Sequence, residues 1–243
     1  MRLPRLPEVL KKRLPQVLSL RLPIVGGPLK GNFWAPGARG KVLRYLTGTY
    51  EPETTQHILD CVKPGDVVFD VGANLGYLTL LFSKLVGDQG RVIAFEPAPH
   101  VARCLEEHVR CNRCTNVTVY PIALGDCQGT VRFENVAGTG RGRVIEEGGI
   151  EVDQETIDRI ALKEGVAPDF IKIDVEGVGA EVLAGGQLTI ARSHPAVYLS
   201  LHSGWEHNQS VEIMTSLGYT YERDEFGELI FQRSPAVQLQ RAA

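Results

Sequence analysis

The chain has 243 residues, of which 43% are hydrophobic and 23% are charged, and its formal net charge is −3. These values are ordinary for a globular protein, and the length allows one domain with a sizeable core and an N-terminal extension. The charge is uneven, because residues 1–44 hold ten Lys and Arg against one acid, a net +9, while the remainder carries −12. An acidic body argues against general nucleic-acid binding.

Residues 1–44 are interpreted as a basic, proline-rich arm, followed by a folded domain over residues 45–243. No apolar run approaches the roughly 18 residues that a membrane span needs, and prolines and charges interrupt every candidate secretory signal. Two alternatives remain for residues 1–30: an irregular arm packed on the domain or on a second subunit, or a segment that touches an anionic membrane surface. The five cysteines indicate a reducing compartment, so we expect a cytoplasmic protein.

A β-α-β unit is predicted over residues 67–96, after a loop and helix over residues 45–62. An apolar strand leads into Asp70 and a tight turn over residues 72–76, a helical segment follows to residue 86, and a second apolar strand ends on Glu96. Gly72 and Gly76 allow the sharp turn and let a ligand approach the backbone. Ligands of open α/β sheets bind at the carboxyl ends of the strands, so we expect a nucleoside-type cofactor here.

The turn itself indicates which cofactor. A dinucleotide-binding loop reads G-x-G-x-x-G and seats a pyrophosphate on a helix N-terminus. This loop has Asn74 in place of the second glycine, and Asp70 would repel a pyrophosphate. S-adenosylmethionine carries two cations and a carboxylate and no phosphate, which suits acidic strand ends and a helix N-terminus. Glu96 is placed to accept the two ribose hydroxyls.

The rest of the chain alternates strand and helix. Helices are predicted over residues 98–113, 178–192 and 206–217, and residues 151–165 are predicted to form the end of a strand followed by a helix. Strands are predicted at 117–121, 130–134, 170–174, 196–202, 219–222 and 229–232. A glycine-rich, charged segment over residues 138–149 is expected to be a mobile loop near the site. The pattern predicts an α/β, Rossmann-like fold whose mostly parallel sheet has helices on both faces and ends in an antiparallel hairpin.

Cys104, His108, Cys111 and Cys114 are metal-capable residues on one predicted helix. Structural zinc sites usually pair separated knuckles rather than one helix face, and free cysteines are commonly buried. We therefore interpret these cysteines as core and helix-end residues and expect no metal site there.

The chain resembles the FkbM-type family of class I S-adenosylmethionine-dependent methyltransferases. The resemblance covers about residues 45–232 and depends on short motifs in one order, namely TYEP (49–52), DVGANLG (70–76), FEP (95–97), Asn112, ALGD (123–126), VDQETID (152–158) and KIDVEG (172–177). It implies a methyltransferase domain with a seven-stranded sheet, which uses S-adenosyl-L-methionine and releases S-adenosylhomocysteine. The residues that it places around the cofactor are Tyr50, Glu51, Asp70, Gly72, Asn74, Gly76, Glu96, Ala123, Leu124 and Asp174.

Two departures from the family pattern concern the acceptor side: Val178-Gly179 stands where Ala-Glu is usual, and Ser200 where a glutamate is frequent. For methyl transfer to a weakly nucleophilic hydroxyl, His202 is the leading general base, because it follows a strand and titrates near neutral pH. Asp174 and Glu176 are the rival bases. The same groups could ligate a divalent cation, an alternative that we do not favour.

The resemblance implies O-methylation of a hydroxyl on a sugar or another small metabolite, free or lipid-linked. The other function classes are an NAD-dependent oxidoreductase, which Asn74 and the acidic strand ends disfavour, and a non-catalytic protein that binds the cofactor. Nucleic acid is not expected as a substrate, because the body is acidic. The sequence does not indicate the oligomeric state.

Overall fold

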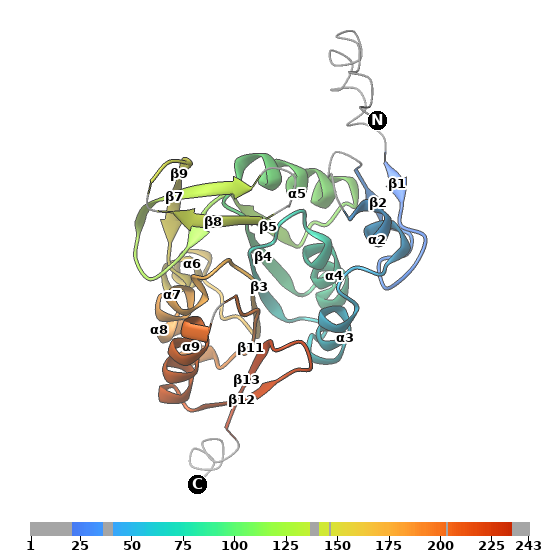
Figure 1. Cartoon of the computed structure of the whole chain (residues 1–243). Helices are drawn as coiled ribbons and strands as arrows, with labels where there is room; N and C mark the ends of the chain where they lie inside the picture. The colour runs from blue at the N-terminus through green and yellow to red at the C-terminus, as the bar shows by residue number, and fades with distance from the viewer. Residues whose placement is uncertain (1–20, 36–40, 137–140, 146, 203, 235–243) are drawn as a thin grey trace.

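A seven-stranded sheet forms the centre of the protein, for which the computed structural model describes residues 21–35, 41–136, 141–145, 147–202 and 204–234. The strands lie in the order β12-β13-β11-β10-β3-β4-β5. Their bounds are β3 Val67–Val71, β4 Arg91–Phe95, β5 Val117–Tyr120, β10 Phe170–Ile173, β11 Ala196–Leu199, β12 Tyr219–Arg223 and β13 Leu229–Arg233. Strands β5, β4, β3, β10 and β11 pair in parallel, and β13 pairs antiparallel with both β11 and β12. The predicted fold class is confirmed (Figure 1).

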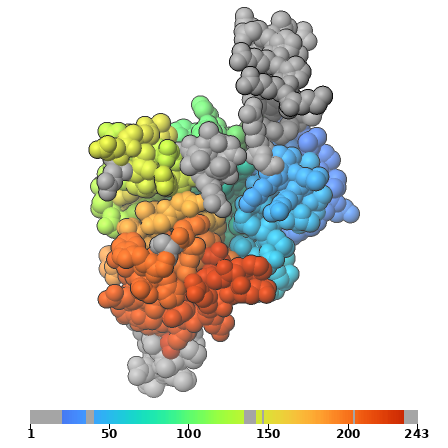
Figure 2. Space-filling model, viewed as in Figure 1, coloured from blue at the N-terminus to red at the C-terminus, as the bar shows by residue number. Residues whose placement is uncertain are grey.

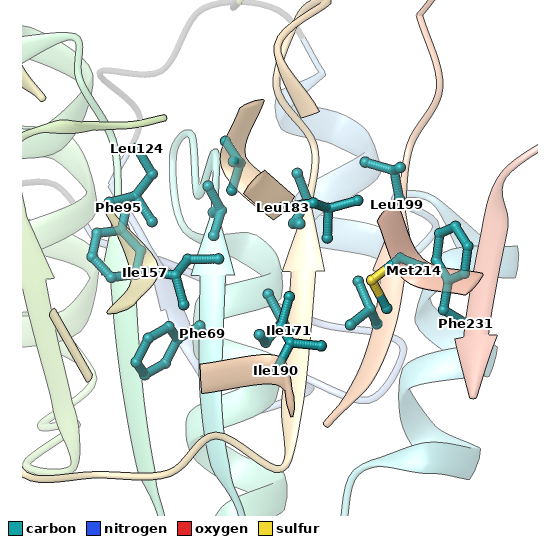
Figure 3. Packing of buried hydrophobic residues seen from close by; sticks show 14 of the residues in the cluster. Phe69, Phe95, Leu124, Ile157, Ile171, Leu183, Ile190, Leu199, Met214 and Phe231 are labelled. Carbon is teal, nitrogen blue, oxygen red and sulfur yellow. The ribbon is translucent and has the colours of Figure 1, made fainter. Parts of the chain in front are cut away.

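Helices cover both faces of this sheet (Figure 1). Their bounds are α2 Val42–Thr47, α3 Pro52–Cys61, α4 Tyr77–Val86, α5 Pro99–Cys111, α6 Ile157–Glu164, α7 Gly179–Ala184, α8 Gln187–Ser193 and α9 Gly204–Ser216. Successive strand residues point to opposite faces. Phe69 and Val71 pack with the helices α6 to α9, while Val68 packs with α3 and α4. Figure 3 shows the first of these clusters, where Phe69 and Ile171 lie beside Ile157 and Ile190.

The helix predicted over residues 178–192 is instead two helices, α7 and α8, separated at Gly185-Gly186. A Cβ on Gly185 would lie 2.0 Å from the carbonyl oxygen of Gly125, so the chain that follows β6 passes directly against this break. The prediction of one helix was wrong because the close approach is a tertiary contact between residues 60 positions apart.

A second sheet of four strands stands beside the main one, in the order β6-β9-β7-β8. Its strands are β6 Ala123–Leu124, β7 Gly129–Val136, β8 Arg141–Ile145 and β9 Ile150–Glu155. The sequence predicted one short strand here and a loop after it, whereas residues 141–145 form β8. Gly142 seats the ring of Phe133, because a Cβ there would lie 2.2 Å from the ring. Residues 137–140 and 146 lie outside the described residues.

The segment before the sheet contributes to the core. It forms β1 Leu22–Pro23 and β2 Phe33–Trp34, and Trp34 is fully buried between Tyr45 and His108, with ring centroids at 4.4 and 3.8 Å. Residues 21–35 therefore pack on the domain, while residues 1–20 lie outside the described part, and the division at residue 44 stays a prediction. No helix of the described chain is long and apolar enough to cross a membrane.

His108 is buried beneath Trp34, and its ring nitrogens face two carbonyl oxygens, of Leu75 at 2.7 Å and of Ala35 at 3.4 Å. Burial lowers the pKa of His108, which keeps the ring neutral in this packing role. Cys111 is buried nearby. Among the described residues, no group of three or more His, Cys, Asp or Glu side chains could hold a metal ion.

A buried ion network joins β3 to β10. Lys172 and Asp70 are direct neighbours in the register of these strands, and Lys172 Nζ lies 3.4 Å from Asp70 Oδ1 and 3.6 Å from Asp174 Oδ2. Lys172 also donates a hydrogen bond to the carbonyl oxygen of Gly72 at 3.0 Å, and Thr79 donates to Asp70 at 2.6 Å. Burial alone would lower the pKa of Lys172, but the charges of Asp174 and Asp70 outweigh it and raise that pKa.

The turn after β3 packs directly on the end of β10. Gly72 has a φ of 75°, and a Cβ on it would lie 2.0 Å from the carbonyl oxygen of Asp174. Its N–H donates to the carbonyl oxygen of Phe95 at 3.0 Å. A side chain at this position would therefore meet both an unfavourable backbone conformation and a steric clash.

We expect Gly72→Ala to lower the free energy of unfolding by about 2–5 kcal/mol, from the cost of positive φ plus that of overpacking. Gly65→Ala is the matched control, because Gly65 has a φ of 93° but a Cβ on it would meet no atom within 4 Å. Only the φ cost of about 1–2 kcal/mol applies there. Urea denaturation measures both, and equal losses would contradict a steric role for Gly72.

Lys172→Met should lower the free energy of unfolding by about 3–5 kcal/mol, because it leaves the fully buried carboxylate of Asp70 without a counter-charge. Adding Asp70→Asn should restore part of that loss. Arg91→Met is the control: Arg91 pairs with Glu164 at 2.7 Å but is 40% exposed, so we expect a loss of at most about 1 kcal/mol. If denaturation curves gave Lys172→Met and Arg91→Met the same free energy of unfolding, the buried network would not be important for stability.

Candidate functional site

A cavity of about 540 Å³ lies at the carboxyl ends of β3, β4, β10 and β11. Most of the residues expected at the site line it, namely Tyr50, Glu51, Gly72, Asn74, Glu96, Ala123, Leu124, Asp174, Glu176 and His202. Ser200 and Val178, the two departures on the acceptor side, line it as well. Parallel strands bring their carboxyl ends to one edge of a sheet, which is why side chains so far apart in sequence meet here.

Glu96 follows β4 and is held by backbone donors on both oxygens. The N–H of Asn74 donates to Oε2 and the N–H of Ala98 to Oε1, each at 2.9 Å. Asn74 adopts a φ of 51°, which turns its N–H toward this carboxylate. Burial raises the pKa of Glu96 to about 7, although the two backbone hydrogen bonds act in the opposite direction. A carboxylate oxygen can accept more than one hydrogen bond, so both oxygens can still accept from a ligand.

Two of the expected residues, Asp70 and Gly76, do not line this cavity. Asp70 has no exposed surface, because its side chain points to the face of β3 that α4 covers. There its carboxylate pairs with Lys172 and accepts a hydrogen bond from Thr79. Gly76 begins α4, and a Cβ there would lie 2.3 Å from Leu105 Cδ1, so this glycine lets α4 pack on α5. Asp70 therefore lies beneath the turn, whereas Gly76 borders a small neighbouring pocket that Gly72 and Asn74 also line.

Asp174, Glu176 and His202 form a charged cluster at one end of the cavity. His202 Nε2 lies 3.3 Å from Asp174 Oδ1, and His202 Nδ1 lies 3.5 Å from Glu176 Oε2. The hydrogen bond with Asp174 raises the pKa of His202 against the effect of burial, and the charge of Glu176 acts in the same direction. Burial by itself would raise the pKa of Asp174, but Lys172 and His202 outweigh it and lower that pKa to about 2.

Glu206 was missed by the sequence analysis and positions this cluster. It is fully buried at the start of α9, and its two oxygens accept from the backbone N–H of Gly179 at 2.8 Å and of His202 at 3.0 Å. A Cβ on Gly179 would lie 2.6 Å from Glu206 Oε1. The absence of a side chain at position 179 therefore leaves the space that the carboxylate of Glu206 from α9 fills. Nothing local in the sequence links the two residues.

Tyr50 and Glu51 close another side of the cavity. Glu51 is a non-glycine residue with a φ of 40°, and it precedes Pro52 at the start of α3. The rings of Tyr50 and Tyr77 pack edge to face, with their centroids 5.2 Å apart. The ammonium of Lys41 lies over the Tyr50 ring, 5.1 Å from its centroid. Burial, with the charge of Glu51, raises the pKa of Tyr50. Strained backbone of this kind concentrates at functional sites.

The second sheet and the C-terminal hairpin supply walls that the sequence analysis did not assign. Phe133 and Val144 come from the second sheet, and with Ile122 and Leu124 they make one end of the cavity apolar. The C-terminal hairpin contributes Phe226 and Glu228 to the opposite, polar end. In Figure 2 the red C-terminal segment lies beside the blue segment that carries α2 and α3. The only sequence signal for these walls was the predicted hairpin itself.

Known proteins resemble this chain in sequence. A family model described as the methyltransferase FkbM domain matches residues 70–221. Hexuronic acid methyltransferase AglP of Haloferax volcanii is 28% identical over 71% of this chain and 70% of that protein. 2-O-methyltransferase NoeI of Sinorhizobium fredii is 26% identical over 54% of this chain, and the match spans 61% of that protein, less than two thirds of its length.

Solved structures resemble it in fold. The methyltransferase FkbM of Methylobacillus flagellatus superposes with a TM-score of 0.53 at 18% identity, over 73% of this chain and 50% of that chain. Precorrin-6y C5,15-methyltransferase of Geobacter metallireducens gives a TM-score of 0.52 at 17% identity, over 81% and 94% of the two chains. At these identities the likeness concerns the fold alone. The family model, which matches more than half of the sequence, shows that the chain belongs to the FkbM family of S-adenosylmethionine-dependent methyltransferases.

Proposed function

We propose that the protein transfers the methyl group to a hydroxyl of a sugar or sugar-like metabolite. The observation that carries this proposal is the imidazole of His202, which lies on the cavity wall with Asp174 at 3.3 Å. A hydroxyl is a weak nucleophile, so a base within hydrogen-bond reach assists its attack. The names of two relatives support the acceptor class, since one is a hexuronic acid methyltransferase and the other a 2-O-methyltransferase.

The cavity fits S-adenosylmethionine in size and chemistry. Its volume of about 540 Å³ lies within the usual range for small-molecule sites. The apolar end, with Leu124, Phe133 and Val144, suits an adenine ring. Glu96 would hold the ribose hydroxyls, and the backbone from Gly72 to Asn74 would border the methionine part.

The charged groups complete this assignment. Asp174 and Glu51 would face the cationic groups of the donor, because both carry a carboxylate on the cavity wall. When bound, S-adenosylmethionine supplies a methyl group that its sulfonium has already activated. The protein therefore has to align the acceptor and remove its proton.

His202 is our proposed base, with Asp174 as the group that orients it. The Nε2 atom faces Asp174, so Nδ1 is the nitrogen that takes the proton from the acceptor. The acceptor hydroxyl then replaces the Glu176 carboxylate as the neighbour of Nδ1. The carboxylate of Asp174 then stabilises the imidazolium ring, and Lys172 keeps that carboxylate ionised. Glu176 remains the rival base, because its side chain is 28% exposed on the same wall.

The membership in a methyltransferase family favours methyl transfer over the NAD-dependent alternative. The loop also departs from the dinucleotide-binding pattern, because Asn74 stands where that pattern has its second glycine. A cytoplasmic location, a lipid-linked acceptor and contact of residues 1–30 with a membrane or a second subunit remain predictions.

We expect His202→Ala to lower kcat by about 10²–10⁴-fold, the usual contribution of general-base catalysis, while leaving the affinity for S-adenosylhomocysteine nearly unchanged. His207→Ala is the control: His207 lies one turn into α9, contacts Tyr221 and Asn208, and is not part of the cavity wall. Mass spectrometry of methylated sugars measures the turnover and calorimetry the affinity. Unchanged turnover in His202→Ala would reject His202 as the base.

The pH dependence should report the same residue. Only the neutral imidazole accepts a proton, and Asp174 raises the pKa of His202, so kcat/KM should increase with pH through a midpoint above the ordinary value of 6.5. Glu176→Gln removes a charge that also raises this pKa, and it should move the midpoint to lower pH. Identical midpoints for the two proteins would contradict the assignment.

A further inference from the structure

Hydrogen bonds of Asp224 hold the turn of the C-terminal hairpin beside the cavity. Asp224 Oδ1 accepts from the N–H groups of Phe226 at 3.0 Å and Glu228 at 2.9 Å. The hydroxyl of Tyr198 donates to Asp224 Oδ2 at 3.4 Å and lies 3.2 Å from Thr54 Oγ1. The turn is thereby linked to the main sheet through Tyr198, whose hydroxyl also contacts Thr54 of α3.

Phe226 and Glu228 are the side chains that this turn presents to the cavity. The ring of Phe226 is 57% exposed, although a large apolar side chain gains by being covered. Glu228 is half-buried, and its Oε2 accepts from the N–H of Leu201 at 2.7 Å, beside His202. That contact fixes the carboxylate and leaves Oε1 able to accept a hydrogen bond from a ligand.

The charge around the polar end is strongly negative. Five carboxylates line the cavity, those of Glu51, Glu53, Asp174, Glu176 and Glu228. Because Glu51 and Asp174 are assigned to the cationic groups of the donor, Glu53, Glu176 and Glu228 are the ones left to face the acceptor. The described cations on the cavity wall already face other groups: Lys41 lies over Tyr50, Arg143 lies 3.4 Å from Glu134, and His202 lies between two carboxylates. A carboxylate on the acceptor would meet like charges here, and such pairs are a strong means of excluding a ligand.

We propose that the C-terminal hairpin recognises the acceptor, and that it selects a sugar without a carboxylate, with the sugar ring against Phe226 and a hydroxyl donating to Glu228. This inference depends on the proposed transfer to a sugar hydroxyl. An aromatic face with a few fixed polar groups is how small-molecule sites combine affinity with orientation. The acceptor class then differs from that of the 28% identical relative, whose name specifies a hexuronic acid.

The test uses the full-length protein with S-adenosylmethionine and pairs of methyl hexosides and methyl hexuronides that differ only at C6. We expect kcat/KM to be at least about tenfold higher for the hexoside of the preferred pair. Glu228→Gln should narrow this ratio several-fold, mainly by improving the hexuronide. Glu225→Gln is the matched control, with the same charge change on the same turn but outside the cavity wall, and it should keep the wild-type ratio.

Phe226→Ala should raise KM for the hexoside by about tenfold with little change in kcat, since the ring contacts the acceptor away from the reacting atoms. Tyr221→Ala, an exposed ring on the same hairpin that is not part of the wall, is its control. Both variants should bind S-adenosylhomocysteine like the wild type.

A hexuronide used as well as or better than its hexoside would overturn this inference and leave the proposed function standing. Transfer to no sugar of either kind, with S-adenosylhomocysteine still bound, would overturn both.

Discussion

The burial of Lys172 between Asp70 and Asp174 is the interaction on which the site depends. A lysine with almost no exposed surface keeps its charge only beside carboxylates, and here one lies on the neighbouring strand and the other two residues further along its own chain. The same ammonium also donates a hydrogen bond to the carbonyl oxygen of Gly72. One charge thus joins the two strand ends, keeps the turn after β3 in place and keeps Asp174 ionised, which in turn raises the pKa of His202.

The cavity divides its tasks between parts of the fold. The parallel strands supply Glu96, Asp174 and His202 at one edge, where we propose that the donor binds and the acceptor loses its proton. The second sheet covers the apolar end, with Phe133 seated on Gly142, and the hairpin covers the polar end. In this arrangement the walls can change with the acceptor while the strand ends stay the same, because each wall belongs to a separate segment of the chain.

Much of the site was predictable because its chemistry is concentrated in short motifs. The glycines of the turn, Glu96 and Asp174 each directly follow or end an apolar run, and the rule for parallel sheets brings such residues together. Asp70 shows the limit of that reasoning. It stands in the same motif, yet the alternation of side chains along β3 points it toward α4. There it pairs with Lys172 and accepts a hydrogen bond from Thr79. Glu206 shows another limit, because its partner Gly179 lies 27 positions earlier in the chain.

The sequence by itself determined the fold class, the family, the donor and the edge of the sheet at which the cavity lies. These depend on local periodicity and on residues within a few positions of one another, which pattern reasoning can read. The tertiary structure decided which carboxylates reach the cavity, how the glycine-rich segment pairs as β8, why the helix after β10 breaks at Gly185, and which side chains the hairpin presents to the cavity. Those features depend on contacts between distant segments, and the free energy of such contacts is set by packing and burial that no single segment specifies.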